Sequence, residues 1–231
     1  MSRLRLATWN IHGGVGLDRR FDPERIARVI GELDVQLVAL QEFHSRDGFA
    51  LREHLERATG WTAVVAPTFV KHGGDFGNAV LSALPVESAA VHDLAVAGRE
   101  PRNAIDVTVA AGSTRVRVVA THLGLRAGER ARQIDRVCGL IGARERCATV
   151  VLGDFNEWWR SGGSMRAIDR VLTPVRAIAT FPSPRALLAL DRAWVSSAVV
   201  RVETQVHRSR LARVASDHLP LIVAIDIDDG G

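Results

Sequence analysis

The chain has 231 residues, 47% of them hydrophobic and 24% charged, so it can bury a full core and is too apolar for a disordered chain. Its formal net charge of +4 is modest, and Lys71 is the only lysine among 30 basic side chains. Such a surface would attract phosphate groups or nucleic acid, but an arginine-rich composition explains the excess equally well. Charge alone therefore decides no function.

The two cysteines and the N-terminus indicate a cytoplasmic protein. Cys138 and Cys147 have the spacing of neither a metal site nor a redox motif. The opening stretch MSRLRLATWN lacks the apolar segment of a signal peptide, and no apolar run is as long as a membrane helix. We expect reduced cysteines, and the sequence indicates no obligate protein partner.

Hydrophobic periodicity predicts strands and helices interleaved along the whole chain. In chain order we expect a strand at Leu4–Asn10, a helix from Pro23 to Leu33 capped by Asp22, a strand at Val35–Glu42, a helix at Phe49–Ala58, strands at Thr62–Ala66, Ala79–Ser82 and Glu87–Leu94, a hairpin turning at Ala111–Ser113, a helix at Glu129–Arg146, a buried strand within Ala148–Trp158, a helix at Met165–Leu172, and strands at Ala189–Ser196, Val199–Gln205 and Leu219–Ile227. No repeat, linker or shift in composition divides the chain. We therefore expect one α/β domain over residues 1–231, with helices outside central sheets.

Polar side chains recur at the ends of these expected strands. They are Asn10 and His12, Gln41 and Glu42, Asn78, His122, Asp154 and Asn156, Asp191, and Asp217 with His218. One such residue is usually a cap or a satisfied buried group, and Gly153, Asp154 and Asn156 taken alone fit a turn. Ligands of α/β proteins, however, collect beyond the carboxyl ends of buried strands, and eight or more such placements are difficult to attribute to turns. We expect these side chains to meet at one site.

The residue types in this set restrict the chemistry. Carboxylate and amide oxygens without cysteine are the ligands of a hard cation such as Mg²⁺ or Mn²⁺. A histidine paired with an aspartate suits general acid–base catalysis, and amides or arginines hold phosphate oxygens. Together these groups indicate metal-assisted hydrolysis of a phosphate ester.

The same residues lie in motifs that resemble the endonuclease/exonuclease/phosphatase superfamily of metal-dependent phosphoesterases, including its deoxyribonuclease-like and sphingomyelinase-like branches. The motifs are TWNIHGG, LVALQE, GNAVLS, ATHLG, VVLGDFN, LDRAWVS and SDHLPL, in the family's order over nearly the whole chain. The resemblance implies a four-layer α/β sandwich, in which two central mixed β-sheets are flanked by helices and the site lies at one edge of the sheets.

The resemblance also implies how the metal and the water are held. Glu42 matches the principal metal ligand, with Asn10 beside it and Asp217 as an addition to the metal shell. Asp154 matches the residue that orients or deprotonates the attacking water. Asn156 matches the amide that binds the phosphate and helps to hold that water.

The remaining matched residues surround the phosphate. His218 matches the histidine near the scissile phosphate, and Asp191 resembles its orienting carboxylate. His122 resembles a second histidine that contacts phosphate or assists the leaving group. Asn78 and Arg102 are further expected phosphate contacts.

Two departures from the family bear on the substrate. Abasic-site endonucleases carry an acid where this chain has His12, and usually tyrosine where it has His122, so a DNA-repair assignment is weakened. The role of His12 stays open. The leading hypothesis is a phosphodiesterase or phosphomonoesterase acting on a phospholipid or a small phosphate ester. A nuclease acting on DNA or RNA, and a catalytically silent phosphate-binding module, remain as alternatives.

Two further features have more than one interpretation. Arg208, Arg210 and Arg213 either rim the site and attract a polyanion or lipid headgroup, or form a solvated loop. Trp158 and Trp159 stack on a base, contact a lipid surface, or simply pack.

Overall fold

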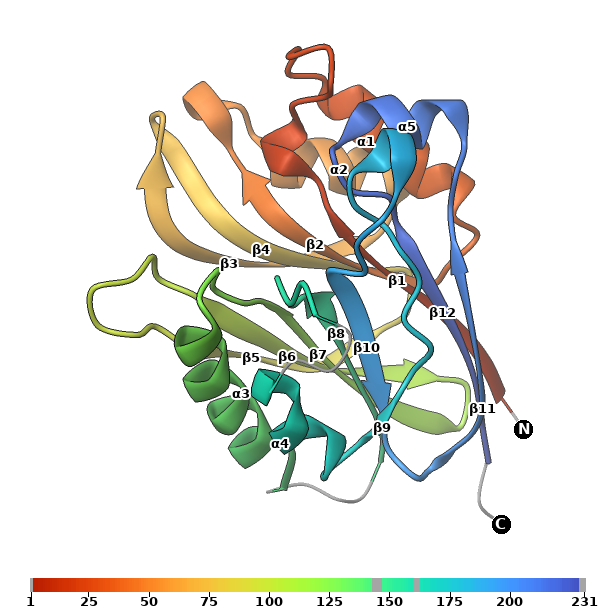
Figure 1. Ribbon diagram of the computed structural model, residues 1–231. Coiled ribbons are helices and arrows are strands. Elements are labelled where there is room, and N and C mark those ends of the chain that lie inside the picture. Colours follow the sequence, from red (N-terminus) through yellow and green to blue (C-terminus); the bar gives the residue numbers. More distant parts are fainter. Residues whose placement is uncertain (1, 143–146, 160–162, 229–231) are drawn as a thin grey trace.

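Two six-stranded sheets lie face to face, and helices cover the outer face of each (Figure 1). The computed structural model describes residues 2–142, 147–159 and 163–228. This arrangement confirms the four-layer α/β sandwich with two mixed sheets that the sequence implies. None of the described helices is long and apolar enough to cross a membrane.

The first sheet has the strand order β11-β12-β1-β2-β4-β3. Its strands are β1 (Ser2–Asn10), β2 (Leu37–His44), β3 (Thr62–Lys71), β4 (Gly74–Ser82), β11 (Val199–Val206) and β12 (Leu221–Ile227). The pair β1–β2 is parallel, and the other neighbouring pairs of the described strands are antiparallel. The helix α1 (Pro23–Glu32) makes the crossover between the parallel strands.

The second sheet has the strand order β5-β6-β7-β8-β10-β9. Its strands are β5 (Val86–Asp93), β6 (Asn103–Ala111), β7 (Thr114–His122), β8 (Ala148–Asp154), β9 (Thr173–Pro174) and β10 (Asp191–Val195). Here β7 and β8 form the parallel pair, joined through the helix α3 (Ala127–Gly142). Both sheets therefore have a parallel pair at their centre.

The helices divide between the two outer faces. In Figure 1, α1, α2 (Leu51–Thr59) and α5 (Arg210–Ala215) lie over the first sheet, and α3 and α4 (Arg166–Asp169) over the second. Short 3₁₀ turns add to these at His12–Gly14, Arg46–Gly48, Gly163–Met165 and Ser183–Arg185. The expected start of α1 is confirmed, because the Arg25 backbone N–H donates to Asp22 Oδ1 at 2.9 Å.

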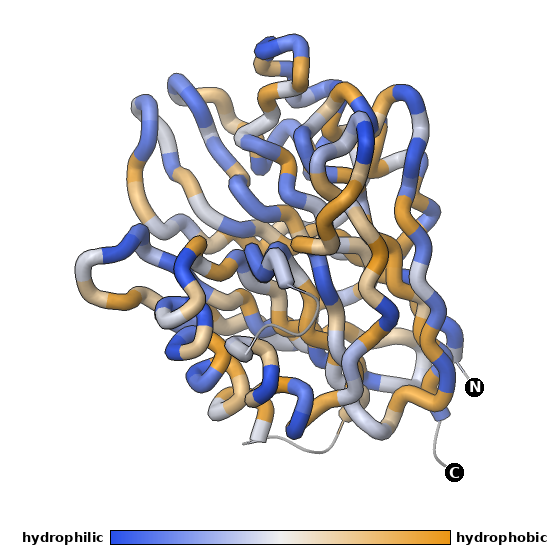
Figure 2. Tube along the Cα trace, in the orientation of Figure 1, coloured by the Kyte–Doolittle hydropathy of each residue, from blue (hydrophilic) through white to orange (hydrophobic). Residues whose placement is uncertain are grey.

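Apolar side chains fill two cores. Figure 2 shows hydrophobic residues concentrated along the central strands, with hydrophilic residues on the loops. The main core lies between the sheets and continues under α1, with Leu6, Leu40 and Val150 fully buried. A second core holds α3 and α4 against the outer face of the second sheet, where the rings of Phe155 and Trp194 lie 4.5 Å apart between centroids. This packing holds the ends of β8 and β10 in place.

Two expected helices differ from the structure. The one expected at Glu129–Arg146 is α3, and residues 143–146 lie outside the described residues. The one expected at Met165–Leu172 is a 3₁₀ turn followed by the four-residue α4, so that prediction was too long. After α4 the chain enters β9, because Pro174 disfavours the helical conformation in the residue before it.

The helix α5 was not expected, because the arginines around it obscured its apolar face. Ser209 begins this helix and its hydroxyl accepts a hydrogen bond from the Ala212 backbone N–H at 3.0 Å. The segment with Arg210 and Arg213 is therefore helical, and the interpretation as a loop is wrong for it.

Candidate functional site

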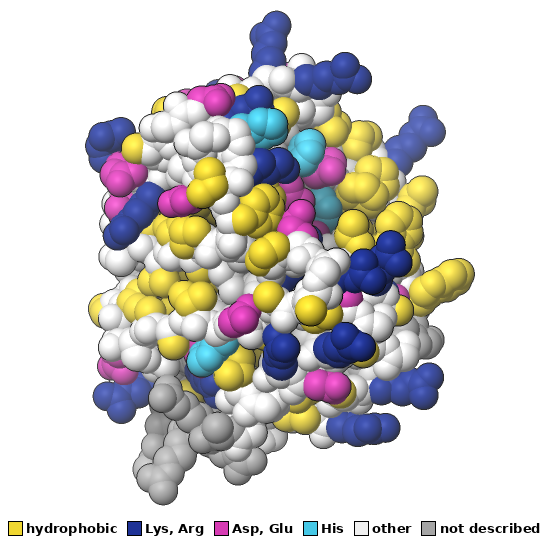
Figure 3. Space-filling model, turned by 90° about the vertical axis from the view of Figure 1, so that its left-hand side faces the viewer, with side chains coloured by type: hydrophobic (Ala, Val, Ile, Leu, Met, Phe, Trp, Pro, Cys, Tyr) yellow, Lys and Arg dark blue, Asp and Glu magenta, His cyan; other side chains and the backbone are white. Residues whose placement is uncertain are grey.

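The carboxyl ends of both parallel strand pairs meet at one edge of the sandwich. Asn10 ends β1, Glu42 lies near the end of β2, and Asp154 ends β8. Asn10 Nδ2 donates to Glu42 Oε1 at 3.1 Å and to Asp154 Oδ2 at 3.0 Å, so one amide joins the two sheets. Figure 3 shows acidic and histidine side chains gathered in a recess on one face of the molecule, with hydrophobic side chains to one side of it.

Asp154 lies at the centre of this cluster and is 1% exposed. Its Oδ2 lies 3.6 Å from Nε2 of His122 and 3.8 Å from Nε2 of His218, while its Oδ1 accepts the Asn156 backbone N–H at 2.9 Å. Burial raises the pKa of Asp154 to about 6, because desolvation of the carboxylate outweighs its attraction to the His218 cation. The group is ionised at neutral pH and close to the range in which a general base is most effective.

His218 is held by Asp191, the first residue of β10. The Nδ1 of His218 donates to Asp191 Oδ2 at 2.8 Å, and the same oxygen accepts the Thr180 hydroxyl at 2.5 Å. Burial alone would lower the pKa of His218, but the charges of Asp191 and Asp154 and the hydrogen bond to Asp191 raise it to about 10. At neutral pH this imidazole is cationic and fixed in orientation.

His122 is the opposite case. Burial, with the positive charges of Arg102 and His218, lowers the pKa of His122 well below its ordinary value, so this ring is neutral. Its Nδ1 lies 3.3 Å from Arg102 NH1 and its Nε2 lies 3.1 Å from Asn156 Nδ2. A neutral imidazole accepts only one of these donors. If Nδ1 accepts from Arg102, then the Nε2–H faces Asp154.

The two histidines therefore differ in charge although both contact the same carboxylate. Titratable groups whose environments drive their pKa values apart are typical of acid–base sites. The cluster is thus able to hold a proton at His218 and accept one at Asp154.

The expected phosphate contacts Asn78 and Arg102 are buried nearby. Asn78 Nδ2 donates to Asn103 Oδ1 at 2.8 Å, and Arg102 NH1 lies 2.9 Å from Glu100 Oε1. Asn78 Oδ1 and Arg102 Nε have no hydrogen-bond partner among the described residues. Their part in phosphate binding stays a prediction.

The backbone directs several of these side chains. Glu42 has φ of 53° and Asn156 has φ of 51°, in the left-handed region that non-glycine residues rarely adopt. At Glu42 the register of β2 against β4 shifts between Leu40 and Phe43, as in a β-bulge. Bulges next to functional sites re-aim a side chain, and strain of this kind is retained where the surrounding structure demands it.

The oxygen donors at this edge fit a divalent cation. The Glu42 carboxylate is partly exposed, and Asp191 Oδ1 is buried without a hydrogen-bond partner in the described part of the chain. Ligand atoms of Asp154, Asp191 and His218 also lie within 4.8 Å of one another. Asp217, expected in the metal shell, is partly exposed, and its Oδ1 lies 3.3 Å from Ser216 Oγ.

Sequence reasoning missed several groups that hold the site together. Ser216 Oγ donates to the Asn10 carbonyl at 2.7 Å and accepts the His218 backbone N–H at 3.2 Å. A serine two residues before His218 is a signal for such a local turn. The buried Glu157 accepts from Ser164 at 2.5 Å and, across 27 residues of chain, from Arg130 at 3.2 Å.

The flanking arginines and tryptophans lie on the surface. Arg208 NH2 donates to the Ala179 carbonyl at 3.1 Å, and Arg213 NH1 donates to the Pro184 carbonyl at 3.3 Å. Trp158 is 57% exposed and Trp159 is 76% exposed, so neither ring is a packing residue of the core.

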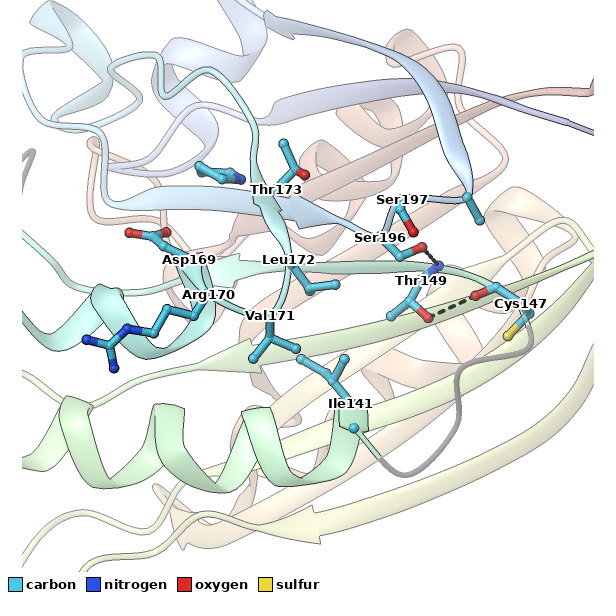
Figure 4. A pocket seen from close by; sticks show the side chains of 13 residues that line it. Ile141, Cys147, Thr149, Asp169, Arg170, Val171, Leu172, Thr173, Ser196 and Ser197 are labelled. Carbon is cyan, nitrogen blue, oxygen red and sulfur yellow. Dashed lines mark hydrogen bonds between the residues drawn. The ribbon is translucent and has the colours of Figure 1, made fainter.

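A cavity of about 510 Å³ lies at the other end of the second sheet (Figure 4). Thr149 and Ser196 line it, and the Thr149 backbone N–H donates to Ser196 Oγ at 2.9 Å. Thr149 is at the start of β8, whereas Asp154 ends that strand. The cavity therefore lies at the opposite end of β8 from Asp154 and is separate from the site.

The sequence profile of the Endonuclease/Exonuclease/phosphatase family matches residues 7–218, which include Asn10, Glu42, Asp154 and His218. The chain belongs to this family. Its members are hydrolases that act on phosphoester bonds, nucleic acids among their substrates, and they use divalent metals. Family membership confirms the resemblance that the motifs indicated.

Individual proteins are similar to this chain over almost its full length. The uncharacterized protein YbhP of Escherichia coli (strain K12) is 28% identical over 244 residues, covering 96% of each chain. An endonuclease/exonuclease/phosphatase from Beutenbergia cavernae has a TM-score of 0.79 at 22% identity, over 98% of this chain and 72% of that one. The human Nocturnin catalytic domain with bound sulfate has a TM-score of 0.77 at 19% identity, over 98% and 94%. The two solved structures show the shared fold.

Proposed function

We propose that this chain is a Mg²⁺- or Mn²⁺-dependent phosphoesterase that cleaves a phosphodiester or phosphomonoester bond of a phospholipid or small phosphate ester. One observation carries the proposal. A buried carboxylate, Asp154, lies 3.6 Å from the neutral His122 and 3.8 Å from the cationic His218. The match over residues 7–218 supports one catalytic domain spanning the chain.

In this proposal Asp154 orients a water molecule and takes its proton as the water attacks phosphorus in line with the leaving group. Asn156 binds the phosphate and helps to hold that water, since its backbone N–H already fixes Asp154 Oδ1. His218, kept cationic and oriented by Asp191, stabilises the charge that develops on the phosphoryl oxygens. His122, backed by Arg102, contacts the phosphate from the other side of Asp154.

Glu42 would hold the cation, with Asn10 beside it and Asp217 as a further ligand. When bound, the cation supplies Lewis-acid stabilisation of the phosphoryl oxygens. The Asn10 amide already places the carboxylates of Glu42 and Asp154 on either side of it, at 3.1 and 3.0 Å. Asp191 Oδ1, which is buried and has no hydrogen-bond partner among the described residues, supports a cation in this region.

The test is hydrolysis with and without Mg²⁺ or Mn²⁺. The substrates are bis-p-nitrophenyl phosphate, p-nitrophenyl phosphate, plasmid DNA, an abasic-site oligonucleotide, RNA, phospholipids and inositol phosphates. Wild type is compared with Glu42→Ala and with a matched control, Glu53→Ala, which removes an exposed carboxylate on α2.

We expect metal-dependent turnover that Glu42→Ala abolishes and Glu53→Ala retains. Preference for plasmid DNA or RNA over the other esters would replace the proposed substrate by nucleic acid. Absence of turnover on every substrate by a folded protein would favour the phosphate-binding module.

A further inference from the structure

A cavity of about 460 Å³ lies beside the acidic and histidine cluster and is not used by the proposed mechanism. We call it the side pocket. Its lining includes Trp158, Leu187, Leu188, Arg176 and Arg192, together with three alanines. Its volume falls in the range of small-molecule pockets, about 300–1,000 Å³.

Three segments form the side pocket, and each runs directly into the site. Trp158 follows Asn156 by two residues, and Ala189 precedes Asp191 by two. Ala179 precedes Thr180, whose hydroxyl donates to Asp191. Two residues of extended chain span at most about 7 Å, so the Cα atoms of Trp158 and Ala189 lie within about that distance of those of Asn156 and Asp191.

The walls of the side pocket are tied to one another. Arg192 Nε donates to the Ala189 carbonyl at 3.0 Å, and its NH2 donates to the carbonyls of Glu157 and Trp159, both at 3.0 Å. One guanidinium thereby joins the wall before β10 to the wall that carries Trp158. The Thr180 backbone N–H donates to the Leu188 carbonyl at 2.9 Å and so joins the third wall, which contains Ala179, to the wall before β10. A ligand therefore enters a preformed pocket and does not have to order its walls.

The lining combines a flat ring, apolar side chains and positive charge. Trp158 is 57% exposed and Leu187 is 79% exposed, so both offer apolar surface that the described chain leaves in water. Arg176 and Arg192 add two planar cations. Indole and guanidinium planes both stack on flat rings, and the guanidinium also attracts a nearby anion.

We propose that the side pocket binds a flat, aromatic ester group of the substrate and so places the scissile phosphate against His218. This inference rests on the proposed phosphoesterase function and names the class of ester that it favours. The aromatic group lies between Trp158 and Leu187, and the phosphate that carries it points toward the acidic and histidine cluster.

The test compares binding of phenylphosphonate and methylphosphonate by isothermal titration calorimetry in the presence of Mg²⁺. Both probes have the same anionic head and a carbon–phosphorus bond in place of an ester, so only the side group differs. Wild type is expected to bind phenylphosphonate about tenfold more tightly, the scale found when a stacking aromatic side chain is removed. Trp158→Ala should abolish this preference and leave methylphosphonate binding unchanged.

Trp159→Ala is the matched control, because this exposed neighbour does not line the side pocket. It should retain the phenyl preference, and Leu187→Ser should reduce it. Equal affinity of wild type for both probes, or a preference that survives in Trp158→Ala, would overturn the proposal. Thermal denaturation of each variant confirms that it is folded.

The binding test does not depend on turnover, so its failure is distinguishable from failure of the proposed function. A Trp158-dependent preference without hydrolysis of any phosphate ester would retain the side pocket as an aromatic-anion site and reject the phosphoesterase function. Metal-dependent hydrolysis, together with a preference for phenylphosphonate that is the same in wild type and Trp158→Ala, would reject the side pocket and retain the function.

Discussion

The two sheets have the same arrangement of strands but contribute different side chains to the site. Each has a parallel pair at its centre with antiparallel strands on both sides, β1–β2 in the first sheet and β7–β8 in the second. Each pair is joined by one crossover helix, α1 or α3. Because parallel strands end at the same edge of a sheet, each sheet brings two strand ends to the site.

The side chains on these four ends differ in exposure. The first sheet contributes Glu42, whose carboxylate is partly exposed, and Asn10, which is 2% exposed and donates to Glu42. The second contributes His122 and Asp154, which are 4% and 1% exposed and have strongly shifted pKa values. A ligand for a cation must be reachable, whereas a base with a raised pKa must be buried. We infer that Glu42 holds the cation and that Asp154 takes the proton.

The largest expected effects come from Asp154 on the second sheet and from His218, which lies just before β12 of the first sheet. Asp154→Asn should lower kcat by at least about 100-fold, because it removes the general base, and His218→Ala should lower it by a similar factor. Steady-state rates over a Mg²⁺ titration measure this, and added Mg²⁺ should not restore the rate. Asp75→Asn, which changes an exposed aspartate on β4, is the control. A loss of less than tenfold in both site variants would contradict the site assignment.

Glu42 on the first sheet should respond differently to substitution. Glu42→Gln is expected to raise the Mg²⁺ concentration for half-maximal activity on the order of 10–100-fold, the scale for a weakened metal shell. High Mg²⁺ should then recover part of the rate, in contrast to Asp154→Asn. If the metal dependence of Glu42→Gln matched that of wild type, the cation would belong instead to the carboxylates of Asp154 and Asp191.

The charge of His218 predicts a pH dependence of stability in the metal-free protein. Its pKa is about 10 in the folded state and 6.5 for the ordinary side chain. Below pH 6.5 both states are protonated and the stabilisation is fully present. Between these values the unfolded state loses its proton first, so stability falls as pH rises, by up to about 1.4 kcal/mol per pH unit.

Urea denaturation in EDTA between about pH 6.5 and pH 10 measures this dependence. The free energy of unfolding of His218→Gln should decline less steeply than that of wild type. Parallel curves for the two proteins would show that Asp191 and Asp154 do not hold His218 in its cationic form.

The sequence alone predicted the parts of the site that depend on local pattern. Strand periodicity placed Asn10, His122 and Asp154 at strand ends, and the parallel pairing of those strands then brought the ends together. The direction of the Glu42 side chain could not be predicted in this way. It is set by a register shift in β2 and by the positive φ of Glu42, and no local sequence pattern indicates either feature. The expected element bounds were least accurate where 3₁₀ turns replace regular helix, as at Gly163–Met165.

Contacts between distant segments could not be predicted from the sequence. Arg192 joins the walls of the side pocket by donating to backbone carbonyls. Every residue has a backbone carbonyl, so the type of residue does not show which one accepts. Arg130 and Glu157 form a buried ion pair at 3.2 Å across 27 residues of chain. Taken singly, each is an ordinary charged residue, and only the folded chain shows that they pair.

The smallest expected effect is on stability, and it comes from Asp22 at the start of α1, outside the proposed catalytic residues. Asp22 caps α1 through the Arg25 backbone N–H and also lies 3.1 Å from Arg25 Nε. Asp22→Ala should lower the free energy of unfolding by about 1 kcal/mol and leave kcat unchanged. Denaturation curves and rates at saturating Mg²⁺ measure both quantities. The Asp22 backbone N–H donates to the Gly14 carbonyl at 2.9 Å, close to the turn that follows Asn10. Asp22→Ala keeps that backbone hydrogen bond, so a fall in kcat without a loss of stability would show that the Asp22 side chain itself helps to position Asn10.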